Sequence, residues 1–188
     1  MLGIHNLLRT EYESLEAAMD AIRAHRRAHG YAMVRKRSKP MKDAPGPRIV
    51  YLECDRHGQH VSTSAGHRNA STRANGCLFS IVLRRIDADQ WDVDIRPHRH
   101  NHPASRSAAA HPSLRQIDMQ AAASTVDTLL SVGTRPNRIH SAVLQLEPTS
   151  AFTSRDLYNT IAKTRREKLG GLSNIEALIK LLKNNQDI

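Results

Sequence analysis

The stretch CLFSIVLRRIDADQWDVDIRPHRHNHP, residues 77–103, predicts much of the N-terminal fold. Residues 77–86 and 90–97 have the length and composition of strands, and the DADQ segment between them is typical of a hairpin turn. Three histidines follow at every second position: His98, His100 and His102. Because residues i and i+2 of a strand point to the same face, two of these rings could converge on one point.

The residues upstream predict one helix and two more strands. Residues 10–30 indicate a helix that starts with a capping box of Thr10 and Glu13 and ends at Gly30. Strand candidates follow at 31–38 and 48–54. Together with the hairpin they predict a four-stranded antiparallel sheet and one helix. A domain of this kind has a thin core, so we expect an additional cross-link, such as a metal site, to stabilise it.

The residues downstream of His102 predict helices. A linker of small residues comes first, and helical segments follow near 113–131, 137–147, 154–168 and 174–184. In the last of these, Ser173 and Glu176 form a capping box. We therefore expect an α+β fold with a sheet domain at 1–104, a helical region at 105–188 and a boundary near 104–112.

The charge of the chain favours a polyanionic partner. Lys and Arg number 28 against 18 Asp and Glu, a net charge of +10. Nucleic acid fits this balance better than an acidic membrane surface does. Aromatic residues are 4% of the chain, which disfavours readout of single strands or RNA by stacking. Since no apolar run approaches the roughly 18 residues of a membrane span, we expect no membrane partner.

The chain has two cysteines, Cys54 and Cys77, which is too few for a disulfide framework. The N-terminus lacks the basic start and the long apolar core of a signal peptide. We therefore expect an intracellular, reducing compartment. In such a compartment, two cysteines near paired histidines indicate a metal site more than a disulfide.

Four residues have a pattern suited to zinc, C-x22-C-x22-H-x-H: Cys54, Cys77, His100 and His102. Each lies at the edge of a predicted strand, and two thiolates with two imidazoles are a common tetrahedral set for structural zinc. No Glu lies within ten residues of either histidine, which favours a closed structural site over a catalytic one. Other histidines compete as ligands: His57, His60, His67 and His98. Alternatively, the histidines are solvated and the cysteines are small buried apolar groups.

Several segments resemble a known family: GYAMVRKRS, RIVYLEC, GCLFSIVLRR and QWDVDIRPHRHNHP. They look like the far-red impaired response type DNA-binding domain of Mutator-like transposases, which belongs to the WRKY and glial-cells-missing zinc superfamily. The resemblance covers about residues 10–104. It implies a WRKY-like sheet and one structural zinc ion held by Cys54, Cys77, His100 and His102. Residues 153–185 are similar to the segment that precedes the catalytic core in fungal Mutator-like transposases.

The same resemblance implies a DNA-binding strand at VRKRSK, residues 34–39. In WRKY proteins this strand enters the major groove. Its Trp and Gly are replaced here by Val and Ser, so the WRKY sequence preference does not carry over. Strand alternation predicts Arg35, Arg37 and Lys39 toward the bases and Lys36 toward phosphate, whereas the resemblance favours Arg35 and Lys36 together. All four are candidate DNA contacts; alternatively, they form a basic edge strand that blocks aggregation.

These observations predict a sequence-preferring, double-stranded DNA-binding protein that acts in the nucleus. It would be derived from a transposase and would serve in DNA binding or transcription regulation. We expect no enzymatic activity, because the resemblance implies a catalytic core with three metal-binding carboxylates that this sequence does not contain. The alternative is a protein-interaction or dimerisation module in which the C-terminal helices form a homodimer or bind another partner, and the zinc domain is vestigial.

Overall fold

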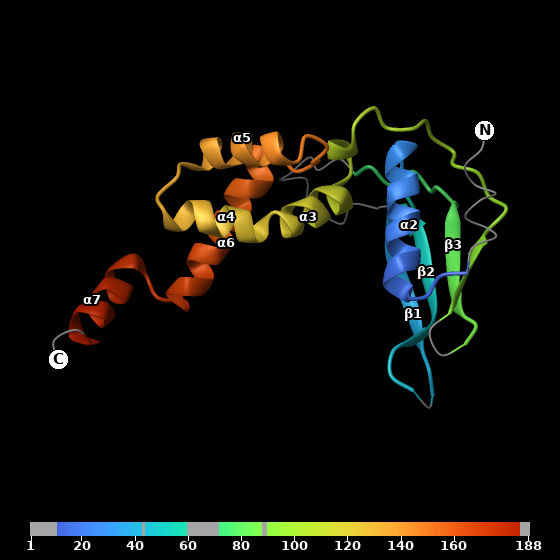
Figure 1. Cartoon of the computed structure of the whole chain (residues 1–188), viewed down its shortest axis with the longest axis horizontal. Helices are drawn as coiled ribbons and strands as arrows, with labels where there is room; N and C mark the ends of the chain where they lie inside the picture. The colour runs from blue at the N-terminus through green and yellow to red at the C-terminus, as the bar shows by residue number, and fades with distance from the viewer. Residues whose placement is uncertain (1–10, 43, 60–71, 88–89, 185–188) are drawn as a thin grey trace. The chain divides into compact units, whose positions relative to one another are not determined.

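The computed structural model describes residues 11–42, 44–59, 72–87 and 90–184. The chain divides into two compact units, residues 1–114 and 115–188. The first contains a helix and a four-stranded antiparallel sheet and the second contains helices, so the fold is α+β as the sequence predicts (Figure 1). We expected domains of 1–104 and 105–188 with a boundary near 104–112, and the two compact units meet between residues 114 and 115.

Helix α2, Leu15–Ala28, begins later than the sequence analysis expected. Thr10 lies outside the described residues, and the N-cap is Ser14, whose side chain accepts a hydrogen bond from the Ala17 amide at 3.0 Å. The residues before it are not helical because Tyr12 forms a β-bridge with Trp91. Their backbone amides and carbonyls exchange two hydrogen bonds, of 3.0 and 2.9 Å.

Four strands form one antiparallel sheet in sequence order: β1 Met33–Pro40, β2 Pro47–Cys54, β3 Ser80–Arg85 and β4 Trp91–Ile95. The predicted strands are thus confirmed, with ends shifted by a few residues. Helix α2 lies across one face of this sheet (Figure 1). We call the opposite face, which carries Tyr51 and Glu53 of β2, the outer face.

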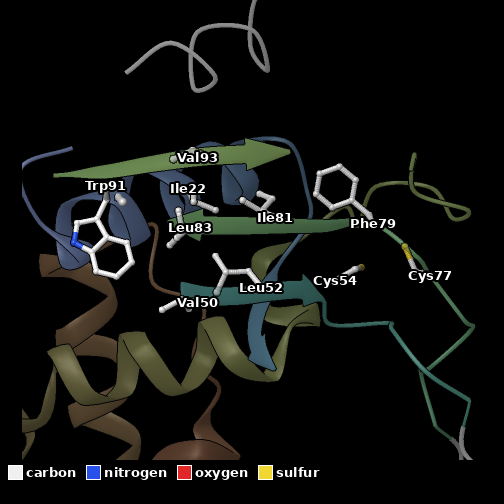
Figure 2. Packing of buried hydrophobic residues seen from close by; sticks show 11 residues of the cluster. Ile22, Val50, Leu52, Cys54, Cys77, Phe79, Ile81, Leu83, Trp91 and Val93 are labelled. Carbon is white, nitrogen blue, oxygen red and sulfur yellow. The ribbon is translucent and has the colours of Figure 1, made fainter. Parts of the chain in front are cut away.

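The core of the first unit lies between α2 and the sheet. Alternate residues of β2 and β3 point into it, as the two-residue period of a strand requires. Figure 2 shows them in two rows, with both cysteines at one end of the sheet and Trp91 at the other. The buried residues of this core are Ala18, Ile22, Val50, Leu52, Cys54, Cys77, Phe79, Ile81, Leu83, Trp91 and Val93.

A β-bulge in β1 corrects the predicted alternation of its basic residues. Arg35 pairs with Leu52 and Arg37 pairs with Tyr51, so Lys36 is an extra residue between two successive pairs. Because paired residues share a face, Arg35 lies on the α2 side with Leu52, whereas Arg37 lies on the outer face. Arg35 and Arg37 therefore do not face the same way.

The second unit is helical, and its helices match the predicted segments closely. We expected one helix near 113–131, but the structure has two that meet at Ala122. The elements from residue 108 onward are the 3-10 turn η1 Ala108–Ala110, then α3 Pro112–Ala121, α4 Ala123–Ser131, α5 Pro136–Leu146, α6 Ser154–Leu169 and α7 Asn174–Asn184. None of the described helices combines the length and apolar character that crossing a bilayer requires.

The core of the second unit is formed by α3 to α6. Its buried residues are Met119, Val126, Ile139, Val143, Phe152, Leu157 and Ile161. Helix α6 starts with a capping box of Thr153 and Asp156. The capping box predicted for α7 is confirmed, since Ser173 and Glu176 exchange side-chain to backbone hydrogen bonds of 2.7 and 3.3 Å. No α7 side chain that the structure describes is buried.

Candidate metal centre

The sheet topology brings the four predicted ligands to one edge. Cys54 ends β2, Cys77 precedes β3, and both histidines follow β4. Since β3 is antiparallel to both neighbours, its start lies beside the ends of β2 and β4. The ligand-bearing atoms of Cys54, Cys77, His100 and His102 all lie within 4.8 Å of one another.

The spacing of these atoms suits a tetrahedral ion. The Cys54 Sγ lies 3.2 Å from Nε2 of His102, and the Cys77 Sγ lies 3.4 Å from Nδ1 of His100. Bonds of about 2.3 Å to sulfur and about 2.0 Å to nitrogen at tetrahedral angles place S and N about 3.5 Å apart. Both cysteines are buried free thiols, and two sulfurs with two imidazole nitrogens form a donor set for a thiophilic divalent ion.

His102 is oriented by its own backbone neighbour. Its Nδ1–H donates a hydrogen bond of 3.0 Å to the Pro103 carbonyl, which leaves the Nε2 lone pair directed at Cys54. A metal-binding histidine commonly has its second ring nitrogen held in this way. The proline that follows the histidine pair in the sequence thus contributes an acceptor to the site.

The ring of His100 is held between two aromatic rings. Its centroid lies 3.8 Å from that of Tyr31 and 4.2 Å from that of Phe79, with planes nearly parallel to both. Two rings stacked this closely on a third must lie on its opposite faces. Arg26 lies over the Phe79 ring at 4.3 Å, which links α2 to this stack. Burial, followed by the charge of Arg26, lowers the pKa of His100 to about 4, so at neutral pH the ring is in the uncharged form that binds metal.

The buried thiol of Cys54 needs a cation in order to ionise. Burial raises its pKa to about 12, although the Arg56 amide donates a hydrogen bond of 3.5 Å to the sulfur. A thiol in this setting stays protonated at neutral pH unless a metal ion replaces the proton. The site therefore fits a metal ion that binds with release of protons.

The two competing histidines that the structure describes, His57 and His98, are not part of the cluster. His57 donates a hydrogen bond from Nδ1 to the Cys77 carbonyl at 2.9 Å, so it braces a ligand instead of serving as one. His98 is exposed and lies outside the cluster. His60 and His67 lie outside the residues that the structure describes.

A buried ion pair beside the centre was missed by the sequence analysis. His111 is fully buried, and its Nδ1 lies 2.6 Å from the carboxylate of Asp55, the residue after ligand Cys54. Its Nε2 lies 3.3 Å from the Gly30 carbonyl. Both ring nitrogens therefore face oxygen atoms of other residues. Burial opposes ionisation of the Asp55 carboxyl, but the hydrogen bond to His111 and the positive charges of His111, Arg73 and Arg56 together lower its pKa.

The four candidate DNA contacts on β1 are all exposed. The ammonium of Lys36 pairs with the Glu53 carboxylate, and the guanidinium of Arg37 stacks over the Tyr51 ring at 4.4 Å. Lys39 pairs with Ile49 in the β1–β2 register and so shares the outer face with Arg37. The structure thus brings Lys36, Arg37 and Lys39 together on the outer face and separates Arg35 from them.

Comparison with known proteins finds a similarity to part of a fungal synthetase. No family model and no solved structure matches the chain. A segment of the PKS-NRPS hybrid synthetase cheA of Chaetomium globosum is 31% identical to it over 180 residues. The match covers 93% of this chain but 4% of the synthetase, so the chain spans a small fraction of that relative's length.

Proposed function

We propose that the chain binds double-stranded DNA through the outer face of a sheet that is stabilised by one structural zinc ion. The observation that carries the proposal is the position of Arg37 and Lys39 on the outer face of an edge strand. The edge strand β1 and its neighbour β2 could present these side chains to the major groove, which is wide enough to admit two strands. The net charge of +10 supplies attraction for phosphate.

Zinc is the proposed metal because of the donor chemistry. Two sulfurs and two imidazole nitrogens within 4.8 Å, with buried thiols, favour a tetrahedral zinc ion over ions that prefer oxygen ligands. The four residues Cys54, Cys77, His100 and His102 would hold it. Four protein ligands fill a tetrahedron, so this ion would stabilise the fold and would not activate water.

The origin and setting proposed for the chain rest on the resemblance of its first 104 residues or so to transposase DNA-binding domains. We infer a transposase-derived DNA-binding or transcription-regulating protein that acts in the nucleus and has no catalytic role of its own. A match covering 93% of this chain but 4% of a synthetase fits a module that recurs within a longer protein.

A second candidate function is homodimer formation through α7. This helix exposes an apolar stripe of Ile175, Leu178, Ile179 and Leu182, whose exposed fractions range from 47% to 71%. Glu176 lies in its first turn and Lys183 in its last. An antiparallel pair of α7 helices would therefore bury the stripe and place opposite charges beside each other. In this case the sheet unit would be vestigial.

Fluorescence anisotropy on a labelled mixed-sequence duplex, over a salt series with and without a strong zinc chelator, tests the proposal. We expect affinity to fall steeply with salt, because phosphate contacts release counterions, and to vanish on chelation. If the chelator leaves the affinity unchanged, DNA binding does not depend on the metal centre, which would contradict the proposal. No binding at moderate salt, together with a dimer mass by sedimentation, would favour the second candidate.

Replacing Arg37 by alanine is expected to weaken binding to the preferred duplex by about 1–3 kcal/mol, or roughly 5- to 150-fold. The reason is that Arg37 lies on the outer face, where its guanidinium lies over the Tyr51 ring. Arg35→Ala is the matched control and should cost much less, because Arg35 lies on the α2 side of the bulge. Anisotropy on a duplex selected with the wild-type chain compares the two, and a larger effect of Arg35→Ala would contradict this assignment.

A further inference from the structure

An acidic residue lies within the proposed DNA-binding face. Glu53 of β2 is on the outer face beside the bulge, and one of its carboxylate oxygens pairs with the ammonium of Lys36. The other lies 3.2 Å from Nε2 of His57. The exposed fraction of the Glu53 side chain is 15%, against 47% for Lys36. A carboxylate so close to a basic strand repels a polyanion. We therefore asked what Glu53 contributes at this position.

The Glu53 carboxylate is held in place from the metal centre. The His57 ring that contacts it also donates a hydrogen bond of 2.9 Å to the carbonyl of ligand Cys77. The same His57 Nε2 lies 3.4 Å from the Lys36 ammonium. A continuous set of polar contacts therefore connects the Cys77 loop to Lys36. Within the described residues no ion pair is found for Arg37 or Lys39, whereas Lys36 has one.

We propose that Glu53 is a specificity-determining residue that restrains Lys36 and limits sequence-independent binding to duplex DNA. This inference rests on the proposed function and deepens it. With its charge matched by Glu53, Lys36 adds little to phosphate attraction, which is the source of non-specific affinity. Arg37 remains available for a guanine edge, where a bidentate contact discriminates between bases. Contacts to bases therefore contribute a larger share of the binding free energy, and contacts to phosphates a smaller share.

The variant Glu53→Gln tests this in the full-length, metal-loaded chain. It is expected to bind a mixed-sequence duplex more tightly than wild type. The slope of log affinity against log salt should become steeper by about 0.9, because Lys36 is released to one phosphate. That corresponds to an additional loss of affinity of about 3.5-fold between roughly 50 and 200 mM salt. The preference for a selected duplex over the mixed-sequence duplex should fall.

Two further variants show whether the effect acts through Lys36. Glu16→Gln removes the same charge from α2, on the other side of the sheet, and should leave the slope unchanged. Lys36→Met should have little effect alone but should return the slope of Glu53→Gln to the wild-type value. Zinc content, measured by a colorimetric chelator, should stay at one ion per chain in every variant.

The outcomes separate this inference from the proposed function. A wild-type chain that does not bind duplex DNA would overturn both. A wild-type chain that binds in a salt-dependent manner, with Glu53→Gln giving the same slope, would overturn the role of Glu53 alone. A Lys36→Met variant that loses slope in the wild-type background would also overturn it, because Lys36 would then already contact phosphate.

Discussion

The variant Cys77→Ser is expected to unfold the sheet unit and not merely to weaken DNA binding. Cys77 is fully buried, lies before β3 and provides one of four converging ligand atoms. Structural zinc contributes an apparent binding free energy of about 10–16 kcal/mol, which matches or exceeds the whole stability of a small domain. A serine at this position has no thiolate to offer, so the ion and the stability that it provides are lost together.

Trp91 provides a direct readout of this unfolding. It is the sole tryptophan of the chain, its exposed fraction is 4%, and it lies at the end of the sheet far from the cysteines (Figure 2). We expect its emission to shift to the red in Cys77→Ser, as it should in the wild type after chelation. The helical circular dichroism of the second unit should persist, because that unit has its own core.

The matched control for this prediction is His98→Ala. His98 is exposed, lies outside the cluster and is two residues from His100. Its removal should leave zinc content and Trp91 emission unchanged. A Cys77→Ser protein with native strand content, buried Trp91 and no metal would contradict the structural role of the ion.

Much of the metal centre could be predicted because its residues are tied to the ends of strands. Cys54 and Cys77 adjoin strands whose apolar runs are evident in the sequence, and antiparallel pairing then brings these ends together. The ring stack around His100 could not be predicted in this way. Tyr31 and Phe79 are 48 residues apart in the sequence, and only the folded sheet brings them to opposite faces of one imidazole.

The bulge in β1 escaped the sequence analysis for a different reason. Register is specified by a hydrophobic pattern, and residues 35–40 are all exposed, so no burial requirement opposes an inserted residue. The face of each basic side chain is instead decided by contacts with β2, in particular Lys36 with Glu53 and Arg37 with Tyr51. The side chains that β1 presents to DNA are therefore determined by residues of β2 as much as by the sequence of β1.

The variant His111→Ala is expected to destabilise the sheet unit by about 3–5 kcal/mol, because it removes one partner of a buried pair and leaves the Asp55 carboxylate without its hydrogen bond to the ring. The exposed fractions of the two side chains are 0% for His111 and 8% for Asp55. His111 also contacts the Gly30 carbonyl, so it joins the residues after the histidine pair to the end of α2. The sequence suggested a linker here because small residues dominate, whereas the structure has the turn η1 followed directly by the fully buried His111.

Urea unfolding followed by Trp91 emission measures this loss, and a double-mutant cycle with Asp55→Asn assigns it to the pair. The neutral Asn needs no buried cation, so the double variant should be more stable than the sum of the two single effects predicts, by about 0.5–3 kcal/mol. Arg106→Ala in the same segment, where the side chain is exposed, is the control and should cost less than about 0.5 kcal/mol. Additive effects of His111→Ala and Asp55→Asn would mean that the two residues act separately. The stability of the sheet unit would then come from its metal centre and apolar core alone. Residues 105–114 would act as a linker, as the sequence suggested.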